Sequence, residues 1–89
     1  MIRQELPIVN RLGLHARAAA KFVRCASAFD STVEVERNGS RVNGKSIMGV
    51  MMLAASQGTS IMVQVEGADE ARAVAALASL VADRFEEPE

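Results

Sequence analysis

Several residue types are scarce in this chain of 89 residues, and each scarcity excludes a class of function. Tyr and Trp are absent and Phe occurs three times, so the chain lacks the aromatic platform on which single-stranded nucleic acid bases stack. Cys25 is the only cysteine, which excludes an intrachain disulfide and a thiolate metal cluster. His15 is the only histidine, so no second imidazole can join it in a metal site, and no cofactor is expected.

Long apolar runs are also lacking. The residues after Met1 are mostly polar rather than the apolar core of a signal peptide. The longest apolar run covers residues 47–55, far short of the roughly 20 residues that a membrane span needs. We therefore expect one domain over residues 1–89, without membrane insertion, in the reducing cytoplasm.

Charge is balanced overall but divided unevenly along the chain. The net charge is −1, yet residues 1–45 carry eight basic and four acidic side chains, and residues 46–89 carry two basic and seven acidic ones. This division has two interpretations: a simply solvated surface, or a basic face that meets an acidic partner or a phosphate group.

Alternating apolar residues predict four strands, over residues 5–9, 32–37, 40–42 and 60–66. Pro7 places the first strand at a sheet edge, because proline cannot donate a hydrogen bond to a neighbouring strand. The Asn38-Gly39 pair predicts a hairpin between the second and third strands.

Apolar stripes at helical spacing predict three helices, over residues 16–28, 47–56 and 70–85. Ser46 and Asp69 are suitable N-caps for the second and third helices. Phe85 ends the apolar stripe of the last helix, and residues 86–89 are expected to form a frayed acidic tail. The order β-α-β-β-α-β-α predicts an α+β fold, with a four-stranded antiparallel sheet covered on one face by three helices.

The candidate functional residue is His15, which lies in a Gly-containing loop one residue before the first predicted helix. It is either an ordinary surface imidazole or a phosphoryl acceptor. Unpaired N–H groups at a helix N-terminus favour anions, and the guanidinium of Arg17 suits phosphate oxygens. Both positive features disfavour the imidazolium and so leave a lone pair for nucleophilic attack on phosphorus.

Two stretches resemble a known family. Residues 13–23, Gly-Leu-His-Ala-Arg-Ala-Ala-Ala-Lys-Phe-Val, resemble the active-site stretch of HPr, the histidine phosphocarrier of bacterial phosphotransferase systems. Residues 43–51, Asn-Gly-Lys-Ser-Ile-Met-Gly-Val-Met, resemble its regulatory serine region, and the spacing between the two stretches also matches. The resemblance covers essentially the whole chain.

The resemblance implies an open-faced β-sandwich and a carrier that is not itself an enzyme. His15 would accept a phosphoryl group on ring nitrogen δ1, the pros nitrogen, from enzyme I, which draws it from phosphoenolpyruvate. Arg17 would steady the group, and the A-component of an enzyme II would receive it. Ser46 is either only a helix cap or, by the resemblance, a serine that the HPr kinase/phosphorylase phosphorylates. Members of the family are typically monomers, so the resemblance also implies a monomer.

A Met-rich surface beside Ser46 is the predicted docking site for protein partners. A helix on one sheet face cannot bury every side, so Ile47, Met48 and Met51 are expected to stay partly exposed, and methionine adapts to several partners. Arg24 and Lys45 from the basic half of the chain complete the predicted partner-binding set.

Four alternatives remain open. Ala18 stands where many sugar-branch members have proline, so the stretch looks more like the nitrogen-related branch, whose output is regulation rather than sugar transport. A purely regulatory protein of the same fold is disfavoured by the presence of His15 and Arg17. A nucleic-acid-binding module is disfavoured by the lack of aromatics, and a small acyl-phosphate hydrolase would release inorganic phosphate without an acceptor.

Overall fold

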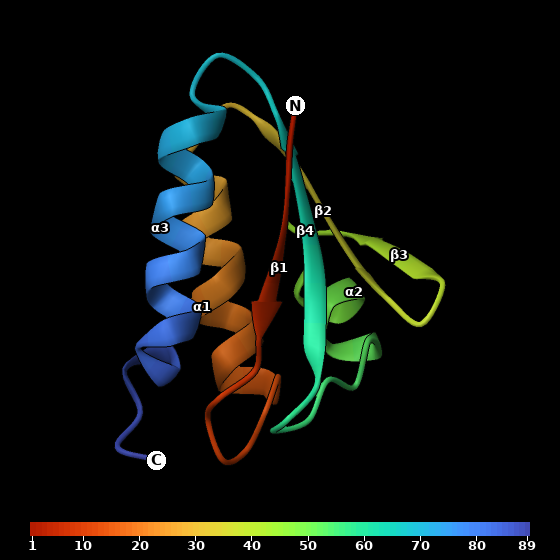
Figure 1. The fold of residues 1–89 in the computed structure, drawn as a ribbon, viewed down its shortest axis with the longest axis vertical. Helices are drawn as coiled ribbons and strands as arrows, with labels where there is room; N and C mark the ends of the chain where they lie inside the picture. Colours follow the sequence, from red (N-terminus) through yellow and green to blue (C-terminus); the bar gives the residue numbers. More distant parts are fainter.

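A computed structural model describes residues 1–89, and its four strands form one antiparallel sheet in the order β1-β4-β2-β3 (Figure 1). The strands are β1 (Ile2–Pro7), β2 (Thr32–Arg37), β3 (Ser40–Asn43) and β4 (Ser60–Glu66). The helices are α1 (Ala16–Ser27), α2 (Ile47–Met52) and α3 (Glu70–Ala82), followed by a short 3₁₀ turn, η1 (Arg84–Glu86). The element order and the α+β class predicted from the sequence are confirmed.

Strand pairing explains why alternate side chains face one core. Val33 and Val35 on β2 pair with Val65 and Val63 on β4, and all four are buried. At the other side of β4, Leu6 of β1 pairs with Ile61. Because strand side chains alternate between faces, one face of the sheet becomes apolar and the other polar.

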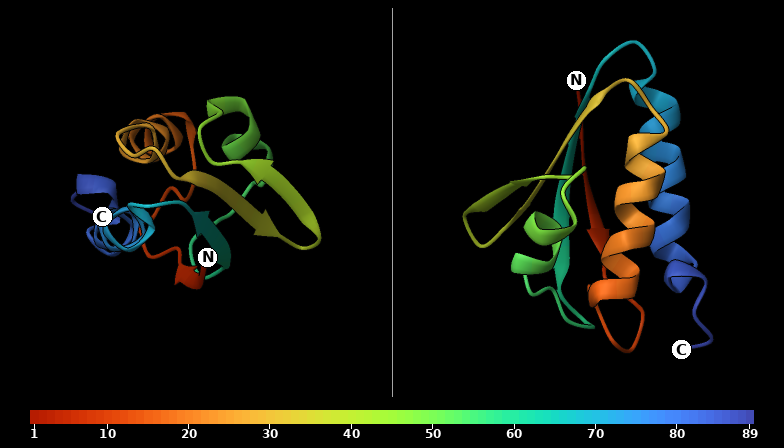
Figure 2. Two further views of the ribbon diagram at one scale, coloured as in Figure 1. Left: turned by 90° about the horizontal axis from the view of Figure 1, so that it is seen from above. Right: turned by 180° about the vertical axis from the view of Figure 1, so that it is seen from behind.

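The helices cover the apolar face of the sheet. α1 and α3 lie side by side against it, and α2 lies beside α1 and β3 (Figure 2). Phe22 of α1, Val50 of α2 and Leu77 of α3 are fully buried in one core of 20 apolar residues. No helix has the length and apolar character needed to cross a membrane.

The predicted ends of the first strand are wrong. It runs from Ile2 to Pro7 rather than over residues 5–9, because β1 pairs with β4 along nearly its whole length, from Ile2 opposite Val65 to Pro7 opposite Ser60. The polar residues near the N-terminus conceal this strand, since the pairing partner decides it rather than the local alternation. The predicted edge position of Pro7 is confirmed, because β1 pairs with β4 alone.

The second helix is shorter than predicted. α2 ends at Met52, and the chain tightens through Leu53 and Ala54, whose amides donate to the carbonyls three residues earlier. Ala54 adopts a positive φ of 51°, which ends the helix and lets Leu53 and Ala55 enter the core. Burial of these two side chains therefore overrides the helical pattern of residues 53–56.

The C-terminal end departs most from the predictions. α3 stops at Ala82, and Arg84, Phe85 and Glu86 all adopt left-handed backbone conformations, with φ of 57°, 54° and 65°. Such conformations cost roughly 1–2 kcal/mol per residue, so a run of three needs compensation. Phe85 supplies it by complete burial, so it belongs to the core as expected but not to the helix.

Asp69 also behaves differently from the prediction. It occupies the N-cap position of α3, but its carboxylate makes no cap bond to that helix. It accepts instead from the amides of Asp30 and Ser31 and from the Ser31 hydroxyl, in the turn before β2. The hydrogen bonds from the Ser31 hydroxyl and the Asp30 amide are the main reasons that the pKa of Asp69 is lowered.

Candidate functional site

His15 is the N-cap residue of α1. Its backbone is extended, with φ of −75° and ψ of 178°, and its carbonyl accepts from the amide of Ala19 at 2.8 Å. Its ring acts as the cap, because the Arg17 amide donates to His15 Nδ1 at 3.3 Å. An imidazole therefore occupies the position in which Ser, Thr or Asp usually caps a helix.

The preceding segment, residues 10–15, is here called the His loop, and close packing fixes its path. Gly13 has a φ of 66°, and a Cβ added there would lie 2.4 Å from the carbonyl oxygen of Ala55. The Leu14 amide donates to that same oxygen, and the Leu14 side chain is buried. Asn10 Nδ2 donates to the Gly13 carbonyl at 2.9 Å, so the ring of His15 starts from a rigid loop.

The C-terminal strap, residues 84–89, lies beside the His loop (Figures 1 and 2). Glu87 Oε2 lies 2.5 Å from His15 Nε2, and Glu87 Oε1 accepts from Asn10 Nδ2 at 3.0 Å. The Arg11 amide and guanidinium both bind Glu89, at 3.0 Å and 2.6 Å. The predicted frayed tail is thus wrong, since these residues are hydrogen-bonded to the loop that carries the only histidine.

Further contacts tie the strap to α1. Lys21 Nζ donates to the carbonyl of Phe85 at 2.7 Å and lies 3.7 Å from a carboxylate oxygen of Glu86. The Arg84 guanidinium donates to the carbonyl of Pro88 at 3.3 Å. The buried ring of Phe85 and these bonds bring Glu87 to His15.

The two hydrogen bonds of the ring fix its tautomer. A carboxylate only accepts, so His15 Nε2 carries a proton and donates it to Glu87. The Arg17 amide only donates, so Nδ1 holds a lone pair. The geometry therefore leaves the lone pair on Nδ1, the nitrogen that the family resemblance names.

Glu87 is ionised at neutral pH despite its partial burial. Its side chain is 10% exposed. Desolvation raises the pKa of Glu87, but hydrogen bonds from Asn10 and His15, together with the positive charge of Lys21 nearby, outweigh it and lower the pKa. No sequence signal reveals Glu87, because 72 positions separate it from His15 and its neighbours form an acidic C-terminal run.

Arg17 stands beside this pair with its guanidinium free of hydrogen bonds and ion pairs. It lines a hollow of about 190 Å³ that the His loop and the strap enclose. The other lining residues are Arg11, Leu12, Glu87, Pro88 and Glu89. Because Arg11 is already paired with Glu89, Arg17 is the guanidinium available to an anion at this point.

Ser46 is the N-cap of α2, as predicted from its position. Its Oγ accepts from the Gly49 amide at 3.1 Å, and its backbone is extended, with φ of −117° and ψ of 116°. Ser46 as a whole is half-buried. Its only hydrogen bond is therefore to its own helix, three residues away.

An apolar patch surrounds α2, and its members leave much of their surface in solvent. Met48 is 70% exposed and Met52 77% exposed, while Ile47 and Met51 are exposed to 43% and 37%. Leu12 of the His loop, which lines the hollow beside Arg17, is also 66% exposed, and the sequence pattern did not single it out.

The two basic residues predicted for partner binding differ. Arg24 is exposed on α1 and unpaired. Lys45 is half-buried and donates from Nζ to the carbonyl of Phe29 at 2.8 Å, so its ammonium is already engaged within the protein.

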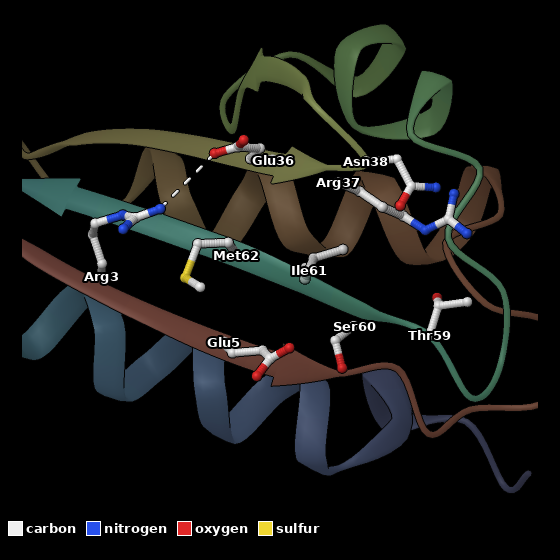
Figure 3. A pocket seen from close by; sticks show the side chains of 9 residues that line it. All are labelled: Arg3, Glu5, Glu36, Arg37, Asn38, Thr59, Ser60, Ile61 and Met62. Atoms are coloured by element: carbon white, nitrogen blue, oxygen red, sulfur yellow. Dashed lines mark ion pairs between the residues drawn. The ribbon is translucent and has the colours of Figure 1, made fainter.

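The polar face of the sheet holds a separate hollow of about 350 Å³ (Figure 3). Two of its lining residues, Arg3 and Glu36, lie 4.0 Å apart. Arg37, also in the lining, donates to the carbonyl of Leu53. None of the predicted site residues lines this hollow.

Comparison with known proteins places the whole chain in one group. The family model described as "PTS HPr component phosphorylation site" matches residues 2–83. The phosphocarrier protein HPr of Neisseria meningitidis serogroup A is 56% identical over 89 residues, covering all of both chains. The crystal structure of HPr-C-His from Thermoanaerobacter tengcongensis superposes with a TM-score of 0.95 at 45% identity, again over all of both chains. An HPr dimer from the same organism superposes with a TM-score of 0.78 at 46% identity, over 98% of this chain and all of the other.

Proposed function

This chain belongs to the HPr family of phosphocarrier proteins of the phosphotransferase system, and we propose that it carries a phosphoryl group on Nδ1 of His15. The donor is enzyme I, which takes the group from phosphoenolpyruvate, and the acceptor is the A-component of an enzyme II. Since phosphoenolpyruvate is a cytoplasmic metabolite, the proposed transfer takes place in the cytoplasm.

The observation that carries this proposal is the pair of hydrogen bonds on the His15 ring. With the proton on Nε2 and the lone pair on Nδ1, the ring is a ready nucleophile. The Nδ1 lone pair forms the new bond to phosphorus, while the bond from phosphorus to the donor breaks and its electrons leave with the donor. The same steps in reverse return the phosphoryl group to the acceptor.

Two groups near Nδ1 suit the oxygens of the transferred phosphoryl group. The N-terminus of α1 presents backbone N–H groups and the positive end of the helix dipole. The unpaired guanidinium of Arg17 is a planar fork of donors that matches phosphate oxygens. Together they stabilise the negative charge as it arrives, without any metal ion from the protein.

Docking of both partners is proposed on the exposed patch of Ile47, Met48 and Met51, with the exposed, unpaired Arg24 of α1 as a further contact. Lys45 contributes less than the sequence indicates, because Phe29 holds its ammonium. Turnover belongs to the partners, so the protein acts as substrate and product in turn. Phosphorylation of Ser46 by an HPr kinase/phosphorylase stays part of the proposal, as does a monomeric state.

The test is direct. The protein and its His15→Ala variant are incubated with phosphoenolpyruvate and enzyme I, once from a sugar system and once from a nitrogen-related one, and intact mass is followed. We expect one acid-labile phosphoryl group on the wild type and none on the variant, with the preferred enzyme I assigning the branch. If neither enzyme I labels the wild type, the carrier function is refuted.

A further inference from the structure

The C-terminal strap places a carboxylate on the far side of the His15 ring from the predicted phosphorylation nitrogen. Glu87 Oε2 lies 2.5 Å from Nε2, and the Glu87 side chain is largely buried. Three consecutive left-handed residues and the buried Phe85 hold the strap against the His loop. In the proposed function the Glu87 contact fixes the tautomer of the unphosphorylated ring, and it has no role yet once the phosphoryl group is on Nδ1.

Asn10 holds the Glu87 carboxylate in place. Its Nδ2 group divides its two hydrogens between the Gly13 carbonyl and Glu87 Oε1, at 2.9 Å and 3.0 Å. Asn10 is fully buried, and its Oδ1 atom has no hydrogen-bond partner. The side-chain amide of Asn10 is therefore oriented only by the hydrogen bonds that its Nδ2 group donates to the His loop and to Glu87.

A phosphoryl group on Nδ1 changes the charge of the ring. While Nε2 keeps its proton, the phosphorylated ring is cationic, and when the N–P bond breaks the ring leaves as neutral imidazole. If Nε2 has lost its proton, the ring must leave as an imidazolate anion, which is a far poorer leaving group. The protonation of Nε2 thus decides whether the phosphoryl group can be passed on.

We propose that Glu87, positioned by Asn10, is a positioning residue that keeps Nε2 protonated in the phosphorylated protein and so keeps the phosphoryl group transferable. The negative carboxylate favours the cationic ring over the neutral one because the two charges are in contact. This inference rests on the proposed function, since it concerns the phosphorylated state of the same residue. It adds to the tautomer-fixing contact of the unphosphorylated ring a second role for Glu87, in the phosphorylated ring.

The other charged groups around the ring are few. Arg17 and Lys21 lie on α1, Arg11 lies on the His loop, and Glu86 and Glu89 lie on the strap. Lys21 and Arg11 are paired with Glu86 and Glu89. Glu87 is the only one of these groups in contact with Nε2, so it is the group whose removal should change the protonation of the ring most.

The test uses phosphoramidate, a small-molecule phosphoryl donor to imidazoles, so that no enzyme I is needed. The wild type, Glu87→Gln and Glu86→Gln are phosphorylated, freed of donor, and followed by intact mass while the phosphohistidine hydrolyses at a series of pH values. Glu87→Gln keeps an acceptor for Nε2 but removes the charge. Glu86→Gln is the matched control, because Glu86 pairs with Lys21 and does not contact the ring.

We expect hydrolysis to slow above a pH midpoint in the wild type, and that midpoint to fall by about one pH unit in Glu87→Gln but not in Glu86→Gln. Asn10→Ala, which leaves the carboxylate untethered, should lower the midpoint less, in the same direction. Coincident midpoints in the wild type and Glu87→Gln would overturn the proposal.

A second readout needs no phosphoryl group. In NMR spectra of the unphosphorylated protein, the Nε2 proton should be protected from solvent exchange in the wild type and in Glu86→Gln, and unprotected in Glu87→Ala. Equal protection in all three would also overturn the proposal. If enzyme I fails to label the wild type, the proposed function is refuted, but both readouts still report on Glu87.

Discussion

Helices α1 and α2 both begin with a side-chain cap, but the two capping side chains have different further partners. His15 caps α1 by accepting from the amide two residues on, and Ser46 caps α2 by accepting from the amide three residues on. The Ser46 hydroxyl has no other partner. The His15 ring has a second bond, to a carboxylate 72 positions away. The Ser46 cap depends only on residues next to it in the sequence. The His15 ring also depends on the C-terminal strap, which the fold brings to the His loop.

This difference suits the different chemistry proposed for the two residues. A hydroxyl that waits for a kinase needs only to be accessible at the start of a helix. An imidazole that must offer one particular nitrogen needs its other nitrogen occupied, and a local motif cannot supply that second partner. The following changes test the comparison, from the largest expected effect on transfer to the smallest.

Removing the guanidinium of Arg17, beside the His15 cap, should have the largest effect on the rate of phosphoryl transfer. In Arg17→Ala we expect phosphoryl transfer from enzyme I to slow by about 100-fold, because a preorganised donor to the transferred group is lost. Rapid-quench measurement of phosphorylation checks it. Arg72→Ala is the control, since Arg72 is an exposed arginine on α3, and equal rates in the two variants would contradict the role of Arg17.

Changing the exposed apolar patch on α2 should weaken docking rather than chemistry. Ile47→Glu places an unpaired charge in the proposed interface, so we expect KM for enzyme I to rise by about tenfold with kcat little changed. Met48→Ala should raise KM in the same direction. Ala75→Glu, at an exposed position of α3, should leave KM unchanged. Thermal melting shows that the variants stay folded. Wild-type KM values in both patch variants would remove the proposed docking surface.

A negative charge at Ser46 should slow phosphorylation of His15 by weakening the binding of enzyme I. In Ser46→Asp we expect transfer from enzyme I to fall about threefold to tenfold, because a new negative charge repels an acidic partner while a helix N-terminus accommodates it. Steady-state phosphorylation kinetics check it, with Ser40→Asp in the hairpin as the charge control. An unchanged rate in Ser46→Asp would count against regulation at this site.

Removing the Ser46 hydroxyl should lower the stability of the protein and leave the rate of phosphoryl transfer nearly unchanged. Ser46→Ala loses the bond to the Gly49 amide, so we expect unfolding free energy to fall by about 1 kcal/mol. For a domain of this size, that lowers Tm by about 4–8 °C in calorimetry. A transfer rate as low as that of Ser46→Asp would show that the cap itself, rather than its charge, matters to the partner.

The sequence predicts the part of the molecule in which local pattern and burial agree. The alternation of Val33 and Val35 indicates a strand because its apolar face meets the core, and Ser46 indicates a cap because the cap is local. The ends of elements are predicted less well, since β1 is set by its pairing with β4 and α2 is cut short by the burial of Leu53 and Ala55.

The half of the candidate site that sequence cannot predict is the C-terminal strap. Its path depends on the burial of Phe85, which turns the chain through three left-handed residues and brings Glu87 to His15. Nothing in the composition of residues 86–89 distinguishes a carboxylate that holds a ring from one that is merely solvated. The burial of Phe85 and the bonds of Lys21 to the strap decide it.

The central claim is that His15 reacts through Nδ1 because Glu87 occupies Nε2. The most direct measurement is NMR of the ring nitrogens and of phosphorus in the protein phosphorylated by enzyme I. We expect the phosphorus on Nδ1 and a proton on Nε2. Phosphorus on Nε2, or on a residue other than His15, would contradict the account.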